Sequence, residues 1–96
     1  MELIVRIKNQ GALEEREFTN KTTGQAEKFA VMPFVLQHGG ETIYAEMIQE
    51  QARKQGTLDP NYYYVASLSV QARPWTDQQG RQRYETRVVL NRISVL

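Results

Sequence analysis

Cysteine is absent from this 96-residue sequence, and histidine and tryptophan occur only once each. Without cysteine the chain can form no disulfide, thiol nucleophile or cysteine-ligated zinc site, which agrees with a reducing compartment. No apolar run is long enough to span a bilayer. The first ten residues do not have the order of a signal peptide, because their basic residues lie within or after the short apolar run. We therefore expect a cytoplasmic protein with no membrane partner.

The sequence also lacks the common catalytic motifs. It contains neither a P-loop nor a dinucleotide-binding fingerprint. His38 precedes two glycines, as in some oxyanion-hole loops, but no G-x-S-x-G elbow accompanies it, which favours a turn histidine. The glutamates at 14, 15 and 17 have no second group of ligands, so they indicate a solvated stretch rather than a metal site. The sequence predicts a binding protein that is not an enzyme and uses no cofactor or metal.

Length and composition indicate a single globular domain over residues 1–96. The hydrophobic share is 41% and the charged share is 24%, as in ordinary globular proteins, and a chain of this size forms one core. The net charge of +1 hides an asymmetry. Residues 1–70 carry seven basic and nine acidic residues, whereas residues 71–96 carry five arginines and two acidic residues. Positive charge is therefore concentrated near the only tryptophan, Trp75.

The N-terminal part has the pattern of β-strands. The odd-numbered residues of 3–7 are apolar and fall on one face, which predicts a strand with one buried side. The polar stretch 11–17 favours neither strand nor helix, and the turn formers of residues 20–25 predict a loop. Residues 28–36 form an apolar strand pattern in which Pro33 indicates an edge position or a bulge.

One short helix is predicted in the middle of the chain. Residues 42–48 fit either a strand or a helix. Residues 46–56, however, are good helix formers that end in a cationic turn and Gly56. We therefore expect a helix there.

The C-terminal part predicts a β-hairpin. In residues 62–73 the even-numbered positions form an apolar face and the odd-numbered positions after 66 are polar, as in a half-buried strand. A turn follows, and residues 83–96 form the last strand. If the hairpin is centred on Gln79, Trp75 lies roughly opposite Tyr84.

Three strand segments, one short helix and two further strands thus follow one another along the chain. This is the order of the OB-fold, a small, partly open Greek-key barrel that binds oligonucleotides or oligosaccharides. We expect a mainly β protein with a five-stranded OB-fold barrel and one short helix between strands three and four. SH3-like barrels give a similar pattern of strands.

The segment 72–96 resembles the end of the core domain in bacterial single-stranded DNA-binding proteins (SSB). The shared features are a basic residue, an aromatic, a Thr-Asp pair, a turn glycine, an Arg-Tyr pair, a threonine and an apolar strand. Here they are Arg73, Trp75, Thr76-Asp77, Gly80, Arg83-Tyr84, Thr86 and Val88-Val89-Leu90. The match covers about a quarter of the chain, and several side-chain types recur at fixed spacing, which makes it fairly specific.

Upstream the resemblance is looser. Tyr44 occupies the place, just before the helix, where the family has an aromatic that stacks on DNA. Gln71 and Pro74 replace residues that are commonly basic in the family, and the stretch 38–42 lacks the tryptophan of well-studied members. Family members that recruit replication and repair enzymes end in a flexible linker and an acidic tip. This chain ends at Leu96, so we expect docking through such a tail to be missing.

The resemblance implies sequence-tolerant binding of single-stranded DNA in replication, recombination or repair, by a homodimer or homotetramer. Bases in a single strand stack on exposed aromatic rings, and arginines bind phosphates with release of counterions. Replication proteins are further candidate partners. The residues expected at the nucleic-acid site are Trp75, Tyr44, Tyr84, Arg73, Arg81, Arg83 and Lys28.

Other interpretations of these residues stay open. Trp75 could pack across the hairpin on Tyr84, and the arginines could serve only to keep an edge hairpin soluble. Strand propensity alone explains the three tyrosines at 62–64. The chain could instead be a protein-interaction module or a replication-restart accessory protein on the same scaffold, or an RNA-binding or oligosaccharide-binding domain.

Overall fold

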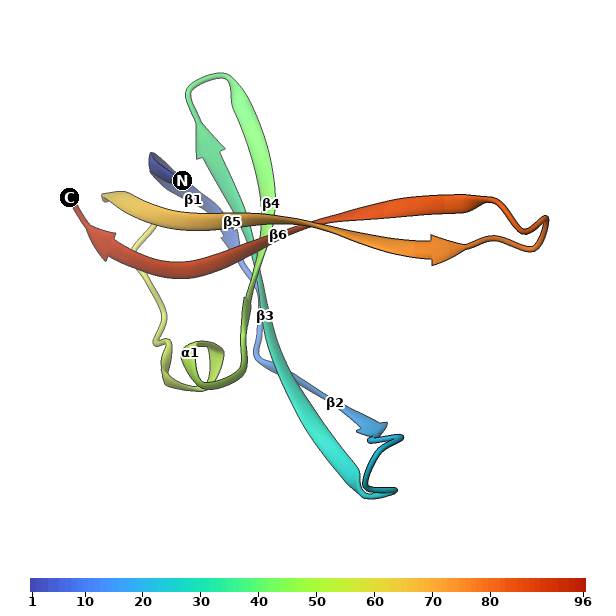
Figure 1. Ribbon diagram of the computed structural model, residues 1–96. Helices are drawn as coiled ribbons and strands as arrows, with labels where there is room; N and C mark the ends of the chain where they lie inside the picture. Colours follow the sequence, from blue (N-terminus) through green and yellow to red (C-terminus); the bar gives the residue numbers. More distant parts are fainter.

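The computed structural model describes residues 1–96 and consists mainly of β-strands (Figure 1). The prediction of a mainly β protein with one short helix is confirmed. No helix in the structure has the length and apolar composition needed to cross a membrane. The elements are β1 (Glu2–Gln10), β2 (Glu14–Thr19), β3 (Ala26–His38), β4 (Glu41–Ile48), α1 (Gln49–Lys54), β5 (Tyr63–Thr76) and β6 (Gln82–Val95).

The six strands form one sheet in the order β1-β5-β6-β4-β3-β2. β1 also pairs with β3, so the hydrogen bonding runs around a ring of five strands. All pairings are antiparallel except that of β4 with β6, which consists of the single parallel pair Glu46 and Val89. β1 pairs with the C-terminal part of β3, and β2 pairs with the N-terminal part of the same strand. The polar stretch 11–17, which favoured no element, therefore contains the start of a strand.

Pro33 lies on β3 at the junction between β1 and β2. β1 ends at Gln10 and β2 begins at Glu14, and between them the N–H of Gly11 donates to the carbonyl oxygen of Pro33 over 2.8 Å. In an antiparallel strand the N–H and C=O of one residue point toward the same neighbour. The N–H that Pro33 lacks would therefore point into the junction, where the ladder is interrupted. β3 has neighbours on both sides, so the predicted edge position is not observed; Pro33 lies instead where one neighbour of β3 ends and the next begins, and its missing N–H interrupts no ladder bond there.

The core is the inner face of the ring, and it is apolar. Successive residues of a strand point to opposite faces, so within the ring every second residue of a strand points inward. The buried side chains are hydrophobic, and the hydroxyl of buried Tyr64 donates to the carbonyl oxygen of Asp59 over 2.8 Å. α1 adds Ala52 to a cluster that includes Val5, Phe34, Leu36, Met47, Leu68 and Leu90.

β5 begins in the ring and ends outside it. Tyr64, Ala66 and Leu68 are buried on its inner face, as the alternation predicts. On the same face, however, Val70 is 59% exposed and Ala72 is also exposed. The reason is that β5 and β6 extend beyond the ring as a two-stranded hairpin (Figure 1). The alternation predicts which side chains of β5 share a face, but it does not predict the residue after which that face is no longer buried.

α1 is shorter than the helix predicted over 46–56. Residues 46–48 continue β4 instead, because they pair with β3. The last turn is basic, as predicted, but the chain leaves the helix at Gln55 in an extended conformation rather than at Gly56. α1 lies at one end of the ring, where it buries Ala52 (Figure 1).

The register of the β5–β6 hairpin corrects one prediction. The turn is centred on Gln79, as expected, but Trp75 pairs with Arg83, and Tyr84 pairs with Pro74. Residues that pair share a face and successive residues alternate, so Trp75 and Tyr84 lie on opposite faces of the hairpin. The predicted juxtaposition of Trp75 and Tyr84 is therefore wrong, and so is the alternative in which the two rings pack together.

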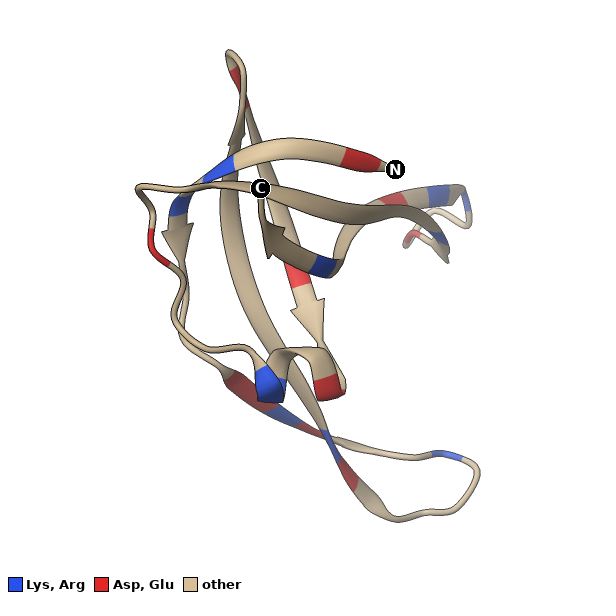
Figure 2. Ribbon diagram, turned by 90° about the vertical axis from the view of Figure 1, so that its left-hand side faces the viewer, with Lys and Arg blue, Asp and Glu red and all other residues tan.

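Two hairpins project from the ring, β5–β6 on one side and β2–β3 on another (Figure 1). Residues of both charge signs are interspersed along them (Figure 2). Neither hairpin is a purely basic arm, although the C-terminal part of the sequence has an excess of arginine.

Candidate functional site

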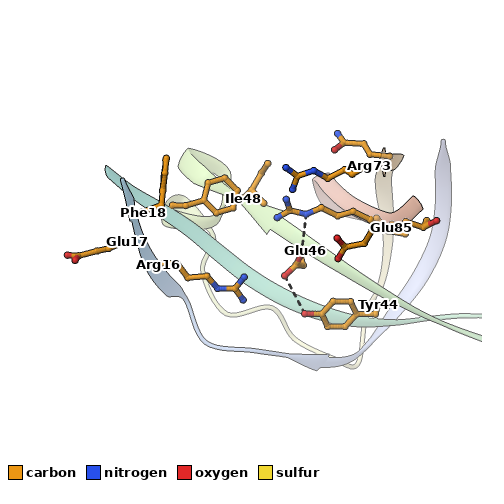
Figure 3. Close-up of a pocket in the computed structure, with 13 residues that line it drawn as sticks. Arg16, Glu17, Phe18, Tyr44, Glu46, Ile48, Arg73 and Glu85 are labelled. Atoms are coloured by element: carbon orange, nitrogen blue, oxygen red, sulfur yellow. Dashed lines mark hydrogen bonds and ion pairs between the residues drawn. The ribbon is translucent and has the colours of Figure 1, made fainter. Parts of the chain in front are cut away.

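An open groove of about 1100 Å³ lies between the two projecting hairpins (Figure 3). β4 forms its floor, β2 and β3 line one side, and β5 and β6 line the other. We call it the outer groove, because it lies on the face of the sheet opposite the core. Its lining residues are Arg16, Glu17, Phe18, Phe29, Tyr44, Glu46, Ile48, Gln71, Arg73, Glu85, Thr86, Arg87 and Val88.

Strand alternation places the floor residues. Ala45 and Met47 are buried in the core, so Tyr44, Glu46 and Ile48 between and beside them point to the other face. Tyr44 is 57% exposed, which leaves much of its ring accessible from the groove. The sequence predicts an accessible aromatic at this position, and the structure places it on the strand that precedes the helix.

The β5–β6 side of the outer groove continues outward to the tryptophan. Arg73 pairs with Glu85, and the next pair on the same face is Trp75 with Arg83. Arg73 takes part in none of the ion pairs of the structure, which are formed by other arginines: Arg16, Arg53, Arg81, Arg83, Arg87 and Arg92. Trp75 is 51% exposed. This face therefore offers an unpaired guanidinium followed by an accessible indole.

An ion pair occupies the middle of the outer groove (Figure 3). Nε of Arg87 lies 3.2 Å from Oε1 of Glu46, and the guanidinium of Arg87 lies over the ring of Phe29, 5.5 Å from its centroid. The Nε is within ion-pair distance but has no hydrogen-bond partner, because its approach to the carboxylate is poorly aligned. The hydroxyl of Tyr44 donates to Oε2 of Glu46 over 3.5 Å. Burial of this hydroxyl and the nearby Glu46 carboxylate raise the pKa of Tyr44.

Asp77 organises the tip of the β5–β6 hairpin. Its Oδ1 accepts from the backbone N–H groups of Arg81 over 2.8 Å and Gln79 over 3.0 Å. Its Oδ2 accepts from Nε of Arg83 over 3.0 Å and lies 3.9 Å from Nε of Arg81. The bond from the Arg81 backbone, followed by the bond from Arg83, lowers the pKa of Asp77. Both arginines at the tip are therefore partly neutralised by Asp77.

The residues predicted for a nucleic-acid site fall into three groups. Tyr44 and Arg73 line the outer groove, and Trp75 and Arg83 lie on the same face of β5–β6 as Arg73. Arg81 lies at the tip beside Asp77. The other two predicted residues lie elsewhere: Tyr84 on the opposite face of the hairpin, and Lys28 opposite Glu17 on β3, outside the groove lining.

Other lining residues were not singled out in the sequence. Arg16 belongs to the stretch 11–17, which favoured neither helix nor strand, and Phe18 lies directly after it. Phe29 is part of an apolar run and Glu46 of a helix-like segment, and neither position has a local signal that would reveal it. Arg87 had such a signal, since it belongs to the arginine-rich end of the chain, but its contact with β4 depends on strand pairing across the ring.

The outer groove is close to neutral. Three arginines and three glutamates line it, and Arg16 is also paired with Glu14 over 3.1 Å. The continuous basic groove that the arginine-rich segment suggests is absent. Aromatic rings therefore distinguish this groove more than net charge does.

No group of three or more His, Cys, Asp or Glu side chains is placed to hold a metal ion. His38 ends β3, and its Nδ1 lies 3.0 Å from the carbonyl oxygen of Ile4 on β1. The imidazole of His38 therefore contacts the backbone of the neighbouring strand β1.

Comparisons with protein-family models, with curated proteins and with solved structures find no match to this chain.

Proposed function

We propose that this protein binds single-stranded DNA in the outer groove, with little dependence on base sequence. The observation that carries the proposal is the row of Tyr44, Arg73 and Trp75. Tyr44 has an accessible ring on the floor, Arg73 has an unpaired guanidinium on the wall, and Trp75 has an accessible indole further along the same face. An open groove with rings and a free cation suits a polymer of stacked bases and phosphates.

The ring of strands supports an OB-fold for this site. With β1 and β2 taken together as one bent strand, the chain has five strands in the ring order β1-β3-β4-β6-β5, and one short helix lies between β4 and β5. An OB-fold is a five-stranded, partly open barrel whose sheet face and loops bind oligonucleotides. The outer groove lies on such a face, between two long hairpins.

The energetics favour stacking over charge as the main source of affinity. Each base stacked on an aromatic side chain contributes about 1–3 kcal/mol whatever its identity. Arg73 adds a phosphate contact, whereas Arg81 and Arg83 must share their charge with Asp77. Binding should therefore tolerate sequence changes and have a modest salt dependence.

The resemblance of residues 72–96 to the SSB core domain also supports the proposal and suggests the biological setting. We propose a role in replication, recombination or repair, with the protein acting as a homo-oligomer. A single domain of this size covers few nucleotides, so several copies on one strand would extend the site.

Trp75 is the only tryptophan, so its fluorescence reports directly on the proposed site. The protein is titrated with oligo-dT at low and high salt, and in parallel with duplex DNA and with oligo-U. We expect quenching by oligo-dT that weakens with salt and is absent with the duplex, because only single strands expose base faces. Binding of oligo-U in preference to oligo-dT would redirect the proposal to RNA. Absence of binding to either strand, checked by anisotropy of labelled oligonucleotides, would overturn it.

A further inference from the structure

Arg87 is the only one of the three arginines lining the outer groove that is not exposed, and its environment is unusual. Its side chain is only 22% exposed and lies over Phe29. Its buried Nε has no hydrogen-bond partner. A guanidinium has five N–H donors in a planar fork that matches a carboxylate or a phosphate. The guanidinium of Arg87 thus packs on the aromatic ring of Phe29, while its Nε–H donor has no acceptor.

Glu46 is the carboxylate that faces Arg87. It lies on β4 at the one position where β4 pairs with β6, and its side chain is 15% exposed. Its Oε1 lies 3.2 Å from Nε of Arg87, and its Oε2 accepts from the hydroxyl of Tyr44. The carboxylate thus lies between the guanidinium of Arg87 and the hydroxyl of Tyr44, within the outer groove.

We infer that Glu46 is a built-in competitor that occupies Arg87 in the free protein and that a phosphate of the bound strand must displace. The inference rests on the proposed function, since it assigns a role to a residue of that same groove. Carboxylate and phosphate oxygens suit the same guanidinium fork. The poorly aligned contact between Glu46 and Arg87 is easier to replace than a well-formed bidentate pair.

This arrangement has two consequences for binding. Glu46 lowers the affinity for single strands, because its charge repels phosphate and its pairing must be broken. It also reduces the salt dependence, because the carboxylate that the phosphate displaces takes up a cation and so offsets part of the counterion release from the new phosphate contact. Glu46 therefore limits how firmly the protein holds any single strand.

The test replaces Glu46 by glutamine, which keeps the size of the side chain and an acceptor for Tyr44. The dissociation constant for labelled oligo-dT is measured by anisotropy over a series of salt concentrations. We expect Glu46→Gln to bind roughly tenfold more tightly at low salt. The slope of log K against log salt should be steeper by at most about 0.7, the value for one phosphate contact on a single strand, because no displaced carboxylate then offsets the counterion release. The double variant Glu46→Gln/Arg87→Gln should lose this gain.

Glu2→Gln is the matched control. It makes the same change in net charge and also releases an arginine, because Glu2 lies 3.7 Å from Arg92 on the outside of the ring, away from the groove lining. Its affinity for oligo-dT should stay within about twofold of the parent. A gain as large as that of Glu46→Gln would show a general charge effect and would overturn the inference.

The remaining outcomes separate the inference from the proposed function. If the parent protein binds oligo-dT and Glu46→Gln binds equally or less tightly, Glu46 is only a structural link between β4 and β6, and the inference fails alone. A lower melting temperature together with weaker binding would lead to the same conclusion. A gain that persists in the double variant would show that Arg87 is not the cation released, and the inference would fail. If neither the parent nor Glu46→Gln binds, the proposed function and the inference fall together.

Discussion

The two ends of the β5–β6 hairpin show what the same strand alternation produces in different surroundings. At the ring end, Ala66 and Leu68 are buried against the other strands. At the free end, Val70 continues the same face but is exposed, and Trp75 on the other face is exposed as well. One pair of strands, each 14 residues long, thus supplies core packing at one end and accessible side chains at the other. Core packing and accessible side chains are therefore separated along the hairpin.

The strongest test of this separation substitutes neighbours on one face of β5. Leu68→Ala should lower the free energy of unfolding by about 2–5 kcal/mol, because it opens a cavity in the core. Val70→Ala should change it by less than about 0.5 kcal/mol, because the side chain is exposed. Urea unfolding of the two variants measures the difference. Similar losses in both would show that the free end of the hairpin is covered in solution, as in an oligomer.

The ring has a second sensitive point at the junction of β1 and β2. A Cβ added to Gly11 would lie 2.5 Å from Cγ of Pro33, closer than two carbons can approach. Gly11→Ala should therefore cost about 1–3 kcal/mol of stability, since the rigid proline ring and the backbone around it must shift. Gly40→Ala, with open space around its Cβ, is the control and should unfold at nearly the same urea concentration as the parent. Equal midpoints for both variants would contradict the close packing at the junction.

At the free end the large effect should be on affinity. Trp75→Ala should weaken binding to labelled oligo-dT by about 1–3 kcal/mol, the contribution of one stacked base. Its thermal stability should stay close to that of the parent, because the indole is half exposed and does not pack on Tyr84. Tyr84→Ala removes an aromatic from the opposite face and should weaken binding less. A larger loss from Tyr84→Ala, measured by the same anisotropy assay, would place the strand on the other face.

The sequence predicts which segments are strands better than it predicts the residues at which they begin, end and pair. Alternation and turn residues locate the hairpin centred on Gln79, because these signals are local. The helix over 46–56 was too long, because residues 46–48 are helix formers that pairing with β3 holds in a strand. The predicted partner of Trp75 was wrong by one residue, because a hairpin centred on Gln79, as predicted and observed, pairs Trp75 with Arg83 rather than with Tyr84.

The candidate site was predictable only in part, and for a related reason. Tyr44, Arg73 and Trp75 are found from residue type and resemblance. The ion pair of Glu46 and Arg87 joins residues that are 41 positions apart in the sequence and meet only where β4 and β6 touch. No periodicity along one strand reveals such a contact, which depends on the closure of the ring.

The arginines of the free end should differ in their contribution to salt dependence. Arg73 is unpaired, whereas Nε of Arg83 donates to Asp77. Arg73→Ala should therefore reduce the slope of log K against log salt by about 0.7, as expected for one lost phosphate contact on a single strand. Arg83→Ala should reduce it less, because Asp77 already neutralises that charge. Equal reductions would show that Arg83 leaves Asp77 when the strand binds.

The smallest expected effect is a local loosening of the hairpin tip in acid. Hydrogen bonds from the Arg81 backbone and from Arg83 lower the pKa of Asp77 below its ordinary value of 3.8. The ionised form thus stabilises the folded tip, and this contribution is complete above pH 3.8 and is lost as the pH falls through the lowered pKa. The amide signals of Gln79 and Arg81, followed by NMR during acid titration, should move together below pH 3.8 while core signals such as that of Leu68 stay unchanged. In Asp77→Asn, which cannot titrate, the same two amides should show no such transition. A midpoint at or above 3.8 in the parent would mean that these bonds do not hold the tip, and the free end of the hairpin would then present its arginines without a fixed arrangement.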